Sequence, residues 1–266
     1  MYAFTYHRAG SLRQAANMVK KEDAKLLAGG MTLLPTMKQR LAAPKNIVDL
    51  SGIDGLAGIE QKGKKVVIGA MARHADVAAS PVVQAAIPGL AARAGGIGDP
   101  AVRHRGTIGG SVANNDPAAD YPAACLALGA TIVTNKRKLA AADFFTGLFS
   151  TALEDGEIIT KVIFPVTTKF AYVKFPNPAS RYAMVGVAVS KKGSDVKVAV
   201  TGAGGGGVFR WTAAEAKLKE KFNAKSVEGL KADAKGLNGD IHASAEYRAH
   251  LIGVMTKRAV AKSLGK

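Results

Sequence analysis

The sequence predicts an α+β protein, because helical and strand-like segments alternate along its first two thirds and separate near its end. Near the N-terminus, the strand-like residues 25–28 run into Gly29-Gly30, and a helix is expected directly afterwards over 33–38. Toward the C-terminus, three strand-like segments between 170 and 201 precede two helical segments between 211 and 263. Consecutive strands followed by helices are typical of an antiparallel sheet covered by helices. We therefore expect small α/β units first and an antiparallel α+β unit last.

The first fifty residues are expected to form one small unit. Ser11 is a suitable helix N-cap, and Gln14 lies three residues later, where the two side chains can satisfy free amides at the helix start. Residues 46–50 predict a strand, and a run of turn-forming residues over 51–55 follows it. These turn formers indicate a boundary, and we assign residues 1–53 to a first subdomain.

A second unit is expected to end with the strand predicted over 157–164, which Pro165 closes. Apolar residues at helical spacing predict a single helix over 82–94. We assign residues 54–166 to this second subdomain and residues 167–266 to a C-terminal domain. The other expected segments are a strand over 65–69, a glycine-rich stretch over 95–110, a helix over 118–128, a strand over 131–133, C-terminal strands over 170–175, 183–190 and 196–201, and helices over 211–222 and 244–263.

The chain is strongly basic, with 37 Lys and Arg against 20 Asp and Glu and a formal net charge of +17. Residues 166–266 carry most of the excess, with 18 basic and 7 acidic side chains. Such a balance fits an anionic ligand, an acidic partner or nucleic acid. Aromatic residues are only 6% of the chain and do not interleave with a basic stripe, which disfavours binding of single-stranded nucleic acid by stacking.

Cys125 is the only cysteine, so the chain can form no internal disulfide and cannot itself ligate an iron–sulfur cluster. Its apolar surroundings favour a buried thiol over a nucleophile. The histidines show no metal-ligand spacing. No apolar run reaches the roughly 18 residues of a membrane span, and residues 1–8 lack the features of a secretory signal. We therefore expect a cytoplasmic protein.

Three glycine clusters could bind anions. Gly202 to Gly207 fits G-x-G-x-x-G, but the next helix begins too late and no βαβ unit surrounds the cluster, so we expect a flexible surface loop. In the clusters at 28–35 and 105–120, turns without Cβ atoms would let successive amides meet phosphate oxygens. Asp116 or Asp120 could accept hydrogen bonds from sugar or ribityl hydroxyls. The spacing equally fits two tight turns, with Asp120 capping a helix.

Residues 28–38 and 107–120 resemble the two FAD signatures of the flavoprotein, or medium, subunit of the molybdenum hydroxylases, the carbon monoxide dehydrogenase and xanthine dehydrogenase family. The similarity extends in order and spacing along nearly the whole chain, including Glu157-Ile158-Ile159 and Lys174 with Ser180-Arg181. The resemblance implies a PCMH-type FAD-binding fold with two small α/β subdomains. It also implies a C-terminal domain made of a three-stranded antiparallel sheet plus helices.

The resemblance further implies roles for individual residues. The two turns would wrap the FAD diphosphate, and Asp120 would hold ribityl or ribose hydroxyls. Ile97 and Ile159 would touch the flavin or adenine, and Lys174 would lie near the flavin. No catalytic base or metal ligand is implied, and FAD is expected to bind non-covalently. The expected cofactor-binding residues are Leu26, Leu27, Ala28, Gly29, Gly30, Met31, Thr32, Leu33, Ile97, Thr107, Ile108, Gly109, Gly110, Ser111, Asp116, Asp120, Ile159 and Lys174.

The function implied is that of an electron-transfer subunit in a heterotrimeric molybdenum hydroxylase, arranged as a dimer of heterotrimers. A large partner subunit would hold the molybdopterin, and a small partner subunit would hold the [2Fe–2S] clusters that feed electrons to FAD. Two alternatives stay open: a stand-alone FAD oxidoreductase, and a basic protein that binds anions or nucleic acid. The sequence leaves open whether the complex oxidises carbon monoxide, an aldehyde, a purine or an N-heterocycle, and which terminal acceptor it uses.

Overall fold

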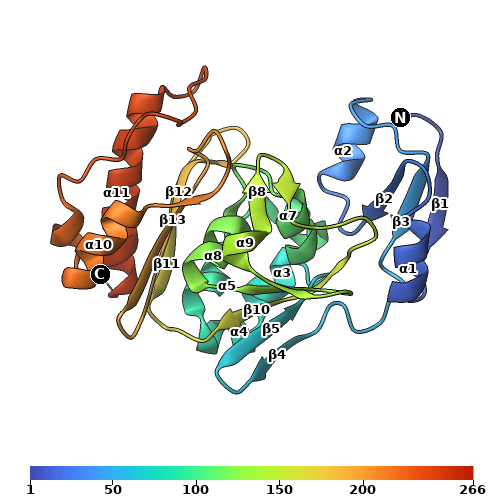
Figure 1. Ribbon diagram of the computed structural model, residues 1–266, viewed down its shortest axis with the longest axis horizontal. Helices are drawn as coiled ribbons and strands as arrows, with labels where there is room; N and C mark the ends of the chain where they lie inside the picture. Colours follow the sequence, from blue (N-terminus) through green and yellow to red (C-terminus); the bar gives the residue numbers. More distant parts are fainter. Residues whose placement is uncertain (266) are drawn as a thin grey trace.

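The computed structural model describes residues 1–265, and its N-terminal unit is built on a three-stranded parallel sheet. The sheet order is β1-β3-β2, with β1 at Thr5–Arg8, β2 at Ala24–Leu27 and β3 at Asn46–Asp49. Helices α1 (Leu12–Met18) and α2 (Leu33–Lys38) join these strands. This unit, blue in Figure 1, contains the expected strand, glycine turn and helix in that order.

The start of α1 follows the predicted capping only in part. The hydroxyl of Ser11 accepts a hydrogen bond from the amide of Gln14, as expected. The side chain of Gln14 instead accepts from the amide of Gly10, one residue before the cap. Both bonds satisfy backbone donors that the helix itself leaves unpaired.

The second unit is an antiparallel five-stranded sheet with the order β4-β5-β10-β6-β7. A cluster of helices covers it, in the centre of Figure 1. The strands are β4 (Ile59–Lys62), β5 (Lys65–Gly69), β6 (Thr131–Thr134), β7 (Lys138–Ala140) and β10 (Ile159–Pro165), and a separate hairpin pairs β8 (Phe145–Gly147) with β9 (Ser150–Thr151). The helices are α3 (His74–Ala79), α4 (Pro81–Ala86), α5 (Pro88–Gly95), α6 (Pro100–Arg105), α7 (Ile108–Asn114), α8 (Asp120–Leu128) and α9 (Ala141–Phe144).

One expectation for this unit was wrong, and one stretch without a predicted element contains helices. The predicted single helix over 82–94 is split into α4 and α5, because Ile87 leaves the helical region with φ −146° and Pro88 begins a new helix. The glycine-rich stretch over 95–110, for which no helix or strand was predicted, contains α6 and the start of α7. Asp99 and Thr107 cap these two helices with their side chains.

The C-terminal unit is a four-stranded antiparallel sheet in the order β11-β12-β13-β14. It has the three long strands that were expected, β11 (Phe170–Pro176), β12 (Ala183–Lys192) and β13 (Asp195–Thr201), plus the two-residue β14 (Phe209–Arg210). Helices α10 (Thr212–Glu220) and α11 (Ala245–Ser263) and the short 3₁₀ helix η1 (Ala224–Val227) complete it.

The side-chain period of two along β12 explains how the C-terminal sheet packs. Val187 and Val189 belong to a core shared with α10 and α11, on the side shown in orange and red in Figure 1. Ala188 lies between them in sequence and belongs to the core of the second unit. One sheet therefore has apolar residues on both faces and joins the helices of its own unit to the second unit.

Each of the three larger sheets, as well as the two-stranded sheet of β8 and β9, lies within one of the predicted ranges 1–53, 54–166 and 167–266, although the boundaries themselves stay predictions. No helix within residues 1–265 is long and apolar enough to cross a membrane.

Candidate functional site

A cavity of about 540 Å³ lies between the first and second units, with one edge formed by the loop between β11 and β12. Its volume is in the range of roughly 300–1,000 Å³ that is usual for ligand and cofactor sites. Both predicted glycine turns line it. The expected site residues that border the cavity are Leu26, Ala28, Gly29, Gly30, Met31, Thr32, Leu33, Ile97, Thr107, Gly109, Gly110, Ser111, Asp116, Asp120 and Ile159.

Three expected site residues do not line the cavity. Leu27 is half-buried at the end of β2, and Ile108 is fully buried in the core of the second unit. Lys174 lies on β11, where its ammonium group contacts Asp120. Lys174 therefore supports the lining residue Asp120 from behind, whereas Ile108 is a core residue.

The first glycine turn approaches the second so closely that a side chain would not fit. A Cβ atom at Gly29 would lie 2.0 Å from the carbonyl oxygen of Arg105 and 2.8 Å from the Cα of Gly106. Gly30 adopts φ +75°, a conformation that L-residues rarely take. Among residues 1–265, the amide groups of residues 29–33 have no hydrogen-bond acceptor. This turn can therefore offer several adjacent N–H donors to an anionic ligand.

The second glycine turn is built differently, because its amides are already used. The amides of Ile108 and Gly109 donate to the carbonyl oxygens of Ala72 and Ala70, at 3.0 and 2.8 Å. The amide of Gly110 donates to the hydroxyl of Thr107. A ligand at this turn would meet Cα atoms and side chains, so close approach of the backbone is what the glycines provide.

Asp120 is the centre of a buried polar cluster between the second and third units. One carboxylate oxygen accepts a hydrogen bond of 2.5 Å from the hydroxyl of Tyr172. The other lies 2.8 Å from Arg93 and 3.1 Å from the ammonium of Lys174. Burial raises the pKa of Tyr172 and lowers the pKa of Lys174, while Asp120 opposes the shift at Lys174. A ligand hydroxyl would therefore meet a carboxylate that already has three protein partners.

Asp120 is not the cap of α8, since Ala119 occupies the N-cap position and Asp120 is the first helical residue. Asp116 also borders the cavity, and its carboxylate accepts a hydrogen bond from the amide of Ala118. Burial raises the pKa of Asp116. Both acids that the sequence singled out thus reach the cavity wall.

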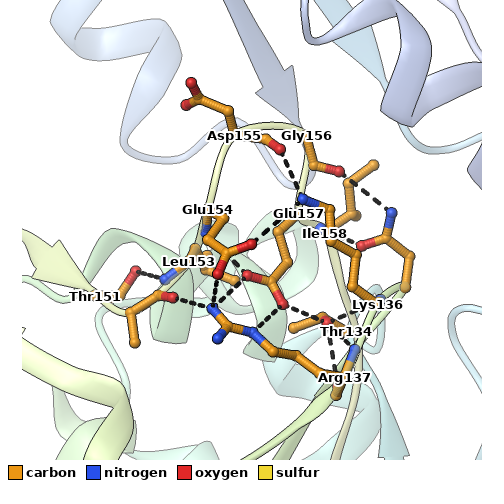
Figure 2. Close-up of polar contacts among 12 residues, drawn as sticks. Thr134, Lys136, Arg137, Thr151, Leu153, Glu154, Asp155, Gly156, Glu157 and Ile158 are labelled. Atoms are coloured by element: carbon orange, nitrogen blue, oxygen red, sulfur yellow. Dashed lines mark hydrogen bonds and ion pairs between the residues drawn. The ribbon is translucent and has the colours of Figure 1, made fainter.

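Ile158 and Ile159 form one wall of the cavity. A polar network holds the backbone at Ile158 (Figure 2). Asn135 uses both ends of its amide: its oxygen accepts from the amide of Ile158, and its nitrogen donates to the carbonyl of Gly156. Ile158 packs into the small apolar core of the first unit, together with residues such as Leu50. A loop of the second unit thus contributes to the core of the first, and this contact joins the two sides of the cavity.

The third glycine cluster, Gly202 to Gly207, does not line the cavity, and the expectation of a surface location was wrong for four of its six residues. Gly202, Ala203, Gly204 and Gly207 are buried, whereas Gly205 and Gly206 are exposed. The amide of Gly202 donates to the carbonyl of Pro117, and a Cβ there would lie 2.3 Å from the carbonyl of Ala183. The amide of Gly202 thus joins the C-terminal unit to the second unit, and its missing Cβ lets the backbone pack tightly against β12.

The expected set of cofactor-binding residues leaves out several residues that line the cavity, although some of them lie within the segments that carry the resemblance. Leu50, Met71 and Ile158 supply apolar surface, and Ser180, Arg181 and Tyr182 reach the cavity from the loop between β11 and β12. The remaining lining residues outside the predicted set are Lys25, Thr36, Ala70, His74, Gly98, Val102, Gly106, Ala113, Asn114 and Ala119. For the loop between β11 and β12, the family resemblance at Ser180-Arg181 was the signal that the sequence offered. Within residues 1–265, no group of three or more His, Cys, Asp or Glu side chains could hold a metal ion.

Comparisons with known families account for both parts of the chain. A family described as the FAD binding domain in molybdopterin dehydrogenase matches residues 2–167. The CO dehydrogenase flavoprotein C-terminal domain matches residues 170–263.

Individual relatives are similar over their whole lengths. The carbon monoxide dehydrogenase medium chain of Hydrogenophaga pseudoflava is 36% identical over 97% of this chain and 96% of its own. The nicotine 6-hydroxylase medium subunit of Paenarthrobacter nicotinovorans is 36% identical over 98% and 97%. Among solved structures, carbon monoxide dehydrogenase from Hydrogenophaga pseudoflava aligns with a TM-score of 0.88 and 35% identity, covering 99% of this chain and 98% of that one. Quinoline 2-oxidoreductase from Pseudomonas putida 86 aligns with the same TM-score at 29% identity and the same coverage.

Proposed function

Because the chain belongs to the FAD-binding medium-subunit family of the molybdenum hydroxylases, we propose that it takes electrons from [2Fe–2S] clusters of a partner subunit and passes them to a terminal acceptor. The chain is an oxidoreductase subunit with FAD as its cofactor. The observation that carries the proposal is the cavity in which a turn with five unpaired amides meets a second glycine turn.

The residues of the cavity fit FAD. We assign the diphosphate to the free amides of residues 29–33, since adjacent N–H donors suit an anion. The second turn, residues 107–111, then lies beside the first, because Gly109 packs directly against Ala70 and a Cβ at Gly110 would lie 3.7 Å from the Cβ of Ala28. Ile97 and Ile159 supply apolar walls that exclude water. We expect non-covalent binding.

The acids and Lys174 have electrostatic and positioning roles in this proposal. Asp116 and Asp120 would accept hydrogen bonds from ribityl or ribose hydroxyls. The ammonium group of Lys174 lies 3.1 Å from the carboxylate of Asp120, which also pairs with Arg93. These two cations and one anion give the cluster a net positive charge when all three side chains are ionised. The isoalloxazine ring of FAD supplies the redox chemistry, so the protein contributes binding, orientation and charge.

We propose that the molybdopterin and the [2Fe–2S] clusters are held by a large and a small partner subunit, in a dimer of heterotrimers. Cys125 is fully buried, and burial raises the pKa of its thiol, so it is unsuited to ligate an exposed cluster. We also propose a cytoplasmic location for the complex. Co-purification of the tagged chain from its native source, followed by measurement of mass and metal content, tests the subunit composition, and cell fractionation tests the location.

The first experiment is an absorbance spectrum of the purified full chain, followed by denaturation and chromatography of the released cofactor. FAD is expected at about one per chain. Gly29→Ala should reduce FAD content, because its Cβ would collide with the Arg105 carbonyl. Gly206→Ala is the control, since nothing lies within 4 Å of a Cβ there. A colourless wild-type chain that takes up no added FAD would refute the FAD assignment.

Electron transfer needs its own test. The FAD-loaded chain is mixed with its partner subunits, and loss of flavin absorbance is followed after addition of the reducing substrate of the complex. Reduction that requires the iron–sulfur subunit supports the proposal. Equal reduction of the chain alone would instead favour a stand-alone FAD oxidoreductase. Salt-dependent retention on DNA without bound FAD would favour the anion-binding alternative.

A further inference from the structure

His74 is a cavity residue to which no role has been assigned above. It begins α3, its side chain borders the cavity, and the residue is only 4% exposed. Its main-chain amide donates a 3.0 Å hydrogen bond to the carbonyl of Gly106. The segment that leads into the second glycine turn is therefore bound directly to the start of α3.

The imidazole of His74 lies against Gly106. A Cβ at Gly106 would lie 2.6 Å from Nε2 and 2.9 Å from Cδ2 of His74. The same glycine contacts the first turn, because a Cβ at Gly29 would lie 2.8 Å from the Gly106 Cα. The Nε2 atom of His74 and the first glycine turn thus both lie next to Gly106.

The other ring nitrogen has no partner. Nδ1 is buried and makes no hydrogen bond within residues 1–265. The ring of Tyr121 lies 5.4 Å away between centroids, and the Tyr121 hydroxyl is also buried without a partner. A buried N–H without an acceptor is rarer and more costly than an unused lone pair, which favours the tautomer with its proton on Nε2.

The imidazole is neutral at physiological pH. Its pKa is lowered to about 4: burial is the largest cause, Asp120 opposes the shift, and Arg93 and Arg103 reinforce it. A neutral imidazole with its proton on Nε2 is a single hydrogen-bond donor on the Gly106 side.

We propose that the Nε2–H group of His74 donates a hydrogen bond to a diphosphate oxygen of bound FAD, beside the amides of residues 29–33. This inference rests on the proposed function, because it presupposes FAD in the cavity. His74 is then a binding residue that helps to orient the cofactor. A bond from a neutral donor to an anionic oxygen is among the stronger hydrogen bonds in proteins.

The first test measures FAD affinity of the full chain, freed of cofactor, by quenching of flavin fluorescence. His74→Phe removes the donor and keeps a ring, and is expected to weaken binding by roughly ten- to a hundredfold. His74→Gln keeps an N–H donor near Nε2 and should recover most of the affinity. His104→Phe is the matched control, because His104 is exposed and does not line the cavity. Equal losses in the Phe and Gln variants, or no loss in the Phe variant, would overturn the proposal.

The second test keeps the proposal falsifiable even if the Phe variant does not fold. The side-chain ¹⁵N signals of His74 in the wild-type chain are recorded with FAD, with ADP and with riboflavin. We expect a protected Nε2–H signal with FAD and ADP, which carry a diphosphate, and none with riboflavin. An Nε2–H signal that is unchanged by FAD, or that also appears with riboflavin, would overturn it. A wild-type chain that binds no FAD shows instead that the proposed function has failed, before His74 is tested.

Discussion

Arg137 binds the carboxylate of Glu157 through two nitrogens, with Nε 3.0 Å from one oxygen and Nη2 3.0 Å from the other (Figure 2). The Thr134 hydroxyl and the Glu154 amide donate to the same carboxylate, whose side chain is fully buried. Glu157 directly precedes Ile158, the residue that packs into the core of the first unit. This ion pair therefore helps to fix the wall of the cavity.

Glu157→Gln is expected to lower the free energy of unfolding by about 2 kcal/mol at neutral pH, because a buried charged hydrogen-bond network is broken. These bonds lower the pKa of Glu157 from 4.5 to about 2. A lowered pKa in the folded state stabilises the protein above the unfolded pKa, and this stability is lost as the pH falls. Denaturant unfolding at several pH values should show the difference from wild type shrinking between about pH 4.5 and pH 2.

Glu154→Gln is the matched control for this experiment, since Glu154 also pairs with Arg137 but its side chain is 59% exposed. Its effect should stay below about 1 kcal/mol, as is usual for exposed ion pairs. A Glu154 effect as large as that of Glu157 would contradict the role assigned to the buried carboxylate.

Ile158→Ala tests the contact between the first and second units. Removing this fully buried side chain should cost roughly 2–5 kcal/mol of stability and also weaken FAD binding, because Ile158 lines the cavity. Ile163→Ala is the control, because Ile163 lies on β10, which begins directly after Ile158, but it is half-buried and does not line the cavity. This variant should leave the FAD affinity unchanged. Thermal unfolding and fluorescence titration measure the two effects, and unchanged FAD affinity in Ile158→Ala would argue against its place in the site.

Gly109→Ala tests the second glycine turn. A Cβ there would lie 2.6 Å from the Cβ of Ala70 and 2.7 Å from its carbonyl oxygen, so α7 must move away from the end of β5. We expect a loss of about 1–3 kcal/mol in stability together with a lower FAD content. Gly58→Ala should have little effect, because nothing lies within 4 Å of a Cβ there. Full FAD content and native stability in Gly109→Ala would show that the turn tolerates a side chain.

Asp120→Asn tests the cluster between the second and third units. It leaves the buried cations Arg93 and Lys174 without their counter-charge, which should cost on the order of 3 kcal/mol or more. Tyr172→Phe removes only one hydrogen bond to Asp120 and should cost about 1 kcal/mol. Urea unfolding measures the loss of stability in each variant, and we expect the larger loss in Asp120→Asn. A larger loss in Tyr172→Phe would mean that the tyrosine hydrogen bond, and not the charge of Asp120, stabilises this junction.

Local sequence signals predicted the elements whose cause is local. Ser11 caps α1 as its spacing indicated, and the apolar residues before Gly29-Gly30 form β2 with α2 directly after the turn. The three long C-terminal strands and the two helices after them lie within a few residues of their expected bounds. Propensity, capping and side-chain period act over a few residues, so one sequence is enough to show them.

The same local signals failed where neighbouring signals competed. The apolar spacing over 82–94 continued through Pro88, yet the proline begins a new helix there. The glycines over 95–110 concealed α6 and α7, which are held by the caps Asp99 and Thr107. In these places a proline or a capping side chain determined where the helix begins, although the apolar spacing or the glycine content was the more visible pattern.

The sequence by itself determined the two glycine turns, the acids beside the second turn and, through the resemblance, the FAD-binding family. Only the tertiary structure decided that the first turn keeps its amides free while the second has already used its own. It alone brought Lys174 to Asp120, 54 residues away, and Ile158 into the core of another unit. Such contacts depend on how whole units pack, and packing is the sum of many distant interactions that no short stretch of sequence contains.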